Sequence, residues 1–174
     1  MGYTHYLPQK KSVSPEAWSQ ICKDTKTILE NQKQASIPLA SDHPSEVMVN
    51  EKAGYINFNG VGDDSHETFA VSQKHDSQFN FCKTAQKPYD LAVTAVLMVI
   101  EHHAPAHFET SSDGDVEDWR PAAELNQKLF GYGYRFPAGV ATGEPELAAE
   151  IESQLEEATT GSPKPKKKNS RYDL

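Results

Sequence analysis

The sequence contains little cysteine and no long apolar run. Its two cysteines, Cys22 and Cys82, lie far apart, which excludes both the paired spacing of a zinc site and the dense pattern of a disulfide-rich secreted domain. No apolar run approaches the roughly 20 residues of a membrane span, and residues 1–11 contain no stretch of signal-peptide length. The sequence therefore predicts a cytoplasmic protein with free thiols and no membrane partner.

Apolar and basic residues are also scarce. The hydrophobic fraction is 37% and the mean hydropathy is −0.67, so the 174 residues predict one domain plus a segment outside its core. The net charge of −8 argues against a nucleic-acid polymer as partner, because phosphate contacts require Lys and Arg. A basic pocket for one small anion is compatible with this charge, because pocket charge is local.

Hydrophobic periodicity predicts short strands mixed with three helices. Ser14 and Pro15 suit the start of a helix over residues 15–32. Residues 88–104 are apolar on nearly every side, which indicates a buried helix, and a third helix begins near Trp119 and ends at Gly131. The predicted strands are residues 2–7, 47–49, 55–58, 68–72, 79–81 and 108–111.

This order of elements predicts an α+β fold. Residues 1–136 should form a single domain with a compact antiparallel sheet and helices on one face. The order contains the split βαβ arrangement of ferredoxin-like folds, with an added C-terminal helix. Residues 137–174 are rich in Pro, Glu and Lys with a thin apolar stripe. They predict a disordered tail with room for one marginal helix.

Four sequence blocks carry a family resemblance. They are MGYTHY at 1–6, FNGVG with HETF at 58–69, FCKTA with KPYD at 81–90, and SSDG at 111–114 followed by Trp119. Over residues 1–136 the chain resembles a family of small proteins of tailed phages and prophages that has no assigned activity. The family has an aromatic residue where this chain has Leu7 and an arginine where it has Gln86. Without that arginine, the resemblance gives no support for a phosphate contact at position 86.

The resemblance implies a biological setting but no mechanism. It implies the cytoplasm of an infected host cell and an accessory role, such as countering host defence or redirecting host metabolism. The implied partner is a small host signal or a host protein, and a homo-oligomer stays open. Likeness at the level of a family does not give a function, so the chemistry has to come from the residues.

Residues 82–90 are the most informative segment for binding. Lys83, Thr84, Lys87 and Tyr89 lie where a predicted strand leads into the buried helix, and free backbone amides and the helix dipole favour an anion there. We expect a small anionic, nucleotide-like ligand. Side chains from other parts of the chain complete this predicted pocket: Tyr3, His5, Tyr6, Asn59 and His66. A solvated loop with idle lysines is the alternative.

An enzyme and a protein inhibitor are the competing hypotheses. His66, Glu67 and Asp113 could perform acid–base work, or hold a metal, on a phosphorylated or nucleotide substrate. The HE pair does not extend to a zinc-protease motif because residue 70 is Ala. Cys82 as a nucleophile requires a nearby base, and a buried, inert thiol is the simpler interpretation. An inhibitor of a host protein would act through the acidic surface. The sequence shows no complete catalytic set, so it favours binding without a cofactor or metal.

Overall fold

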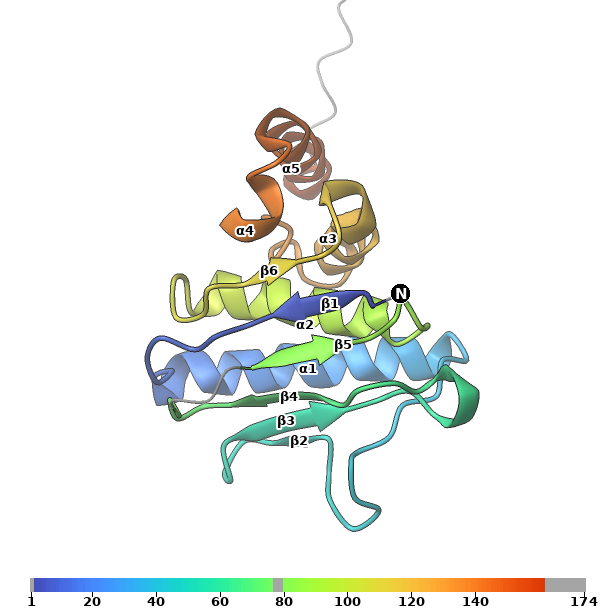
Figure 1. Ribbon diagram of the computed structural model, residues 1–174. Coiled ribbons are helices and arrows are strands. Elements are labelled where there is room, and N and C mark those ends of the chain that lie inside the picture. Colours follow the sequence, from blue (N-terminus) through green and yellow to red (C-terminus); the bar gives the residue numbers. More distant parts are fainter. Residues whose placement is uncertain (1, 77–79, 162–174) are drawn as a thin grey trace, which may run out of the picture.

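The computed structural model describes residues 2–76 and 80–161, in which short strands alternate with helices (Figure 1). The strands are β1 (Thr4–Tyr6), β2 (Val49–Asn50), β3 (Tyr55–Phe58), β4 (Phe69–Ser72), β5 (Phe81–Lys83) and β6 (Ser111–Ser112). The helices are α1 (Pro15–Gln34), α2 (Asp90–His103), α3 (Val116–Phe130), α4 (Ala138–Ala141) and α5 (Pro145–Thr160), with a short 3-10 helix η1 (Gly62–Asp64). The predicted α+β class is confirmed.

In the described ranges the strands form two antiparallel sheets. One has the order β5-β1-β6 and the other β2-β3-β4. In the first sheet His5 lies opposite Cys82 on one side and Ser112 on the other. The single sheet expected from the sequence is therefore divided, and the ferredoxin-like order is not confirmed. Residue 79, the expected start of one strand, lies outside the described residues.

The two sheets meet where the residue pair Glu67 and Lys83 joins the start of β4 to β5. Glu67 N donates to Lys83 O at 3.1 Å, and Lys83 N donates to Glu67 Oε2 at 2.7 Å. A side-chain carboxylate thus replaces a backbone acceptor, so the sheets are joined without a regular ladder.

Helices α1 and α2 lie behind the strands and pack against each other, and α2 also packs against α3 (Figure 1). Residues 92–100 of α2 are all buried, as expected for a helix that is apolar on all sides. Ser14 caps α1, Asp115 forms a capping box at α3, and Gly131 ends α3 in the left-handed conformation. The three predicted helices are confirmed, and α1 extends to Gln34.

The prediction of a disordered tail is wrong for residues 138–160. They form α4 and α5, and α5 packs against α3 with Ala148 and Ile151 only 3% and 2% exposed. Glu152 Oε1 also accepts a hydrogen bond from Phe136 N at 2.9 Å. The apolar stripe is thin, but the surface of α3 supplies the packing that such a helix lacks in isolation. Residues 162–174 of the predicted tail lie outside the described residues.

Candidate functional site

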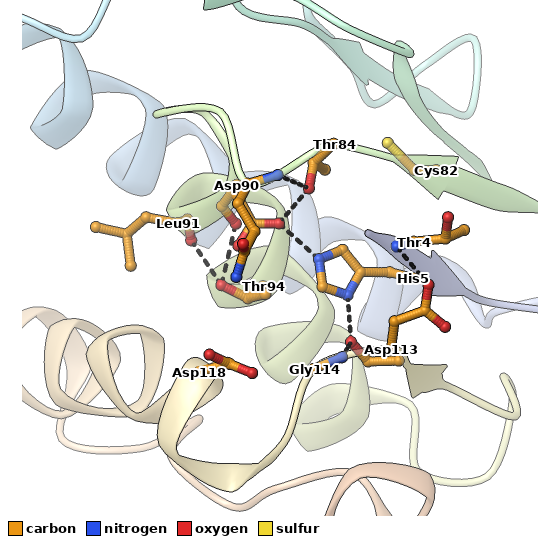
Figure 2. A network of polar contacts seen from close by, with 12 residues as sticks. Thr4, His5, Cys82, Thr84, Asp90, Leu91, Thr94, Asp113, Gly114 and Asp118 are labelled. Carbon is orange, nitrogen blue, oxygen red and sulfur yellow. Dashed lines mark hydrogen bonds and ion pairs between the residues drawn. The ribbon is translucent and has the colours of Figure 1, made fainter. Parts of the chain in front are cut away.

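The four sequence blocks meet at one place in the fold. The sheet β5-β1-β6 contains parts of the first, third and fourth blocks, and Glu67 links the second block to β5. Asp90, the first residue of α2, points toward β1 (Figure 2). Groups that are 109 positions apart in the chain, such as Thr4 N and the Asp113 carboxylate, become hydrogen-bonded.

His5 is the centre of this polar network and is fully buried. Its Nε2 lies 2.6 Å from Asp90 Oδ1 (Figure 2). Its Nδ1 lies 2.8 Å from Ser112 Oγ. A carboxylate can only accept hydrogen bonds, so Nε2 donates to Asp90. In the neutral ring Nδ1 then accepts a hydrogen bond from the Ser112 hydroxyl. The network therefore selects the tautomer and the orientation of the imidazole.

Asp90 is held from two sides. Besides the bond from His5, its Oδ1 accepts a hydrogen bond from Thr84 Oγ1 at 2.5 Å. Its side chain is 17% exposed, whereas that of His5 is 0% exposed. A carboxylate in the first turn of a helix is also favoured by the helix dipole. The pair thus connects β1 to α2 and holds the His5 ring in place.

Two aromatic rings contact His5 edge-on. The ring centroid of Tyr3 lies 5.1 Å from that of His5 and the centroid of Trp119 lies at 5.3 Å, both at 89°. Tyr3 Oη and Trp119 Nε1 are buried and have no hydrogen-bond partner among the described residues. Folded proteins rarely leave buried donors unpaired. Burial, followed by the charges of Asp90 and Asp118, raises the pKa of Tyr3, so the phenol keeps its proton.

The turn after β6 positions Ser112. Gly114 N donates to Ser112 Oγ at 2.9 Å. Asp113 is fixed to β1, because Thr4 N donates to Asp113 Oδ2 at 3.0 Å and Asp113 N donates to Thr4 O at 2.9 Å. A Cβ at position 114 would collide with Tyr3 Oη, so this close approach requires glycine. The Asp113 carboxylate, expected to do acid–base work, instead binds a backbone amide.

Tyr89 and Cys82 have structural roles, because their buried side chains form hydrogen bonds inside the fold. Tyr89 is fully buried, and its Oη donates to Glu67 O at 2.5 Å. Cys82 Sγ donates to the same carbonyl at 3.4 Å. Burial raises the pKa of the Cys82 thiol to about 12, so little thiolate forms near neutral pH. The buried thiol predicted from the sequence is confirmed, and the hydroxyl of Tyr89, which was expected at a ligand, is used inside the fold.

Residues 84–87 form a strained turn in front of α2. Lys87 N donates to Thr84 O at 3.0 Å, and between them Ala85 and Gln86 have φ values of 52° and 56°. Positive φ costs roughly 1–2 kcal/mol in a residue that has a Cβ. Backbone strain of this kind persists only where the surrounding structure imposes it, and it concentrates at functional sites.

The predicted binding residues of this segment separate into two groups. Thr84 and His5 are buried and bond to Asp90, so their polar atoms are already used inside the fold. Lys83 and Lys87 are half-buried, and neither forms an ion pair with a carboxylate in the described part of the chain. Only the second group offers unused polar atoms.

The remaining predicted residues lie along the same sheet. His66 is exposed, and its Nδ1 donates to Lys83 O at 2.8 Å. Asn59 instead stabilises its own loop, because its Nδ2 donates to His66 O at 2.9 Å and its Oδ1 accepts from Gly60 N at 2.8 Å. Tyr6 is half-buried on β1. The structure therefore brings His66 next to Lys83 and gives Asn59 a structural role.

Two other features were not singled out by the sequence. Buried Asp24 accepts a hydrogen bond from Tyr132 Oη at 2.7 Å and pairs with His103 Nε2 at 2.7 Å. A cavity of about 640 Å³ lies between α1 and the segment before β2. Its lining residues are Lys26, Leu29, Glu30, Lys33, Pro38, Leu39, Val47, Met48 and Val49. Two lysines at its wall make this cavity a second place to test for an anion.

The described ranges contain neither a metal-binding cluster nor a membrane-spanning helix. No group of three or more His, Cys, Asp or Glu side chains there is arranged to hold a metal ion. None of the helices described is both long enough and apolar enough to cross a bilayer. Comparison of the chain with protein-family models, with curated proteins and with solved structures finds no match.

Proposed function

We propose that this chain binds a small anionic, nucleotide-like molecule at the surface around Lys83, Lys87 and His66. The observation that supports this proposal is the pair of half-buried lysines that form no ion pair, in a protein of net charge −8. An ammonium group that has no carboxylate partner can form charge-assisted hydrogen bonds to an anion. A bound anion would supply the missing partner.

The local backbone supports the same proposal. The turn at residues 84–87 holds the two lysines on either side of Ala85 and Gln86, close to the first turn of α2. No side chain caps that helix at Tyr89, and Asp90 N donates to Lys87 O at 2.8 Å, so the positive end of the helix dipole lies directly behind this turn. Charge-assisted hydrogen bonds from lysine and from backbone amides are the contacts that phosphate groups use.

We propose further that the ligand is a nucleotide-derived host signal and that the protein is a phage accessory protein that sequesters it. The four blocks that resemble phage proteins support this setting, and sequestration requires no catalytic group. The enzyme alternative based on His66, Glu67 and Asp113 is weaker, because each of these side chains hydrogen-bonds a backbone group. An inhibitor of a host protein is the other alternative.

The direct test is calorimetric titration with ATP, GTP and cyclic dinucleotides. Each charge-assisted hydrogen bond contributes roughly 1.5–3 kcal/mol, so Lys83→Ala/Lys87→Ala should weaken binding by about a hundredfold or more. The melting temperature of the unliganded double variant should change little, because partly exposed lysines contribute little to folding.

Two matched double variants locate the anion. Lys26→Ala/Lys33→Ala removes the lysines of the 640 Å³ cavity, and Lys23→Ala/Lys128→Ala removes two exposed lysines elsewhere. Both should bind like the wild type. Loss of affinity only in the cavity variant would move the site to that cavity. Failure of the wild type to bind any of these nucleotides would refute the proposal.

A further inference from the structure

Ser112, His5 and Asp90 have the geometry of a serine nucleophile with its base and orienting carboxylate. The Ser112 Oγ to His5 Nδ1 distance is 2.8 Å and the His5 Nε2 to Asp90 Oδ1 distance is 2.6 Å. Both lie in the range that proton transfer requires. The three residues come from β6, β1 and α2, which are regular elements that hold side chains more rigidly than loops do.

The ring nitrogens are used in the reverse order of the best-known serine hydrolases, where Nε2 faces the nucleophile. This reversal does not prevent the chemistry, because either nitrogen of a neutral imidazole can accept a proton while the other donates. The bond to Asp90 places the ring proton on Nε2 and leaves the Nδ1 lone pair for Ser112. Thr84 Oγ1 and the edge contacts of Tyr3 and Trp119 restrict the movement of Asp90 and the ring.

Tyr3 supplies a hydrogen-bond donor beside Ser112, which a serine hydrolase needs to stabilise the oxyanion. Its buried Oη has no hydrogen-bond partner among the described residues. It lies against Gly114, and its side-chain contact with the Ser112 hydroxyl lowers the pKa of Tyr3 against the larger, raising effect of burial. A phenol O–H beside Ser112 is suited to donate to an oxyanion that forms during reaction. Ser112 itself is half-buried, whereas His5 is fully buried.

We propose that the chain also hydrolyses carboxylic esters, with Ser112 as nucleophile, His5 as general base and Asp90 as a positioning residue. Ser112 Oγ attacks the ester carbonyl while its proton passes to His5 Nδ1, and the carbonyl oxygen becomes an oxyanion that accepts a hydrogen bond from Tyr3 Oη. The C–O bond of the ester breaks, and the leaving alcohol takes the proton from His5. Water then attacks the acyl-serine, His5 accepts a proton from it, and this proton returns to Ser112 Oγ as the carboxylic acid leaves.

Covalent labelling with an alkyl fluorophosphonate tests the nucleophile. Ser112 Oγ displaces fluoride, so mass spectrometry of the folded wild type should show the phosphonyl group on Ser112, and urea-unfolded protein should stay unlabelled. The matched control is Ser111, which is adjacent on the same strand, half-buried and on the opposite face. Absence of the label, or equal labelling of Ser111 and Ser112, would overturn the proposal.

Cysteine replacement tests the base even if Ser112→Ala fails to fold. In Ser112→Cys the thiol should lose its proton to His5, and iodoacetamide should alkylate it about tenfold faster at pH 7 than the thiol of Ser111→Cys. Cys22 and Cys82 are buried and add little background. Equal rates for the two variants would show that His5 does not activate this position.

Hydrolysis of p-nitrophenyl acetate tests the positioning role of Asp90. Asp90→Asn should lower kcat while KM changes little, because the amide still fills the space but no longer stabilises the charged imidazole. Circular dichroism must show that the variant is folded. An unchanged kcat would exclude the role of Asp90. Nucleotide binding at Lys83 and Lys87 is measured separately, so either proposal can fail while the other stands.

Discussion

Replacing Ile151 by Ala tests whether α5 belongs to the folded domain. Ile151 is 2% exposed and lies on the face of α5 that packs against α3. Replacing a buried Ile by Ala costs about 2–5 kcal/mol. Because α5 stands at the periphery, far from the two sheets (Figure 1), its neighbours can relax, and because Ala is a good helix former, the lower end of that range applies. We expect about 2 kcal/mol.

Thermal unfolding followed by circular dichroism measures this loss. For a protein of this size, 1 kcal/mol shifts the melting temperature by about 2–4 °C, so Ile151→Ala should melt about 4–8 °C below the wild type. The control is Glu150→Ala, an exposed neighbour on the same helix, which should change stability by less than about 0.5 kcal/mol. If Ile151→Ala and a chain ending at residue 137 both have the melting temperature of the wild type, α5 does not stabilise the domain.

Three further predictions concern the site and its surroundings. Gly114→Ala should destabilise the protein to urea by about 1–3 kcal/mol, because its Cβ collides with Tyr3 Oη and Cζ. Tyr3→Phe removes the closer of these two atoms, so it should relieve part of that loss in the double variant. Gln86→Gly should raise the free energy of unfolding by about 1 kcal/mol, since glycine adopts a φ of 56° without strain. The urea midpoint should rise accordingly, and a lower midpoint would mean that the Gln86 side chain contributes more than the strain costs. Burial raises the pKa of Cys22 and Cys82 to about 12, so the stability from these neutral thiols is complete below the unfolded pKa of about 8.5 and is lost as pH rises toward 12. The urea midpoint should therefore fall between about pH 9 and 11, and this fall should be shallower in Cys22→Ala/Cys82→Ala.

Local sequence patterns were sufficient for the helices and for part of the strands. The start of α1 depends on Ser14, and the end of α3 depends on Gly131. These signals act within one turn of chain, so they can be interpreted without the fold. The division into two sheets is different, because it depends on how Glu67 and Lys83 meet across 16 positions. No short-range pattern carries that information.

The sequence named several residues of the candidate site but not the contacts that they make. Lys83, Lys87 and His66 lie on the surface as a binding site requires. Thr84 and His5 were expected at the ligand but are buried around Asp90. Ser112 entered the sequence analysis only as part of the SSDG block. Its block was a visible signal, yet its partnership with His5 depends on the pairing of β6 with β1.

The amino-acid sequence by itself determined the α+β class, the three main helices, the scarcity of basic surface and the polar blocks. All of these follow from composition, periodicity and capping, which act over a few residues. The tertiary structure alone decided that α5 folds, that Asp90 bonds to His5, and that the hydroxyl of Tyr89 is used inside the fold. Each of these outcomes depends on burial and on partners far away in the chain. A side chain's chemistry is known from the sequence, but the groups that desolvate it or share its proton are known only after folding.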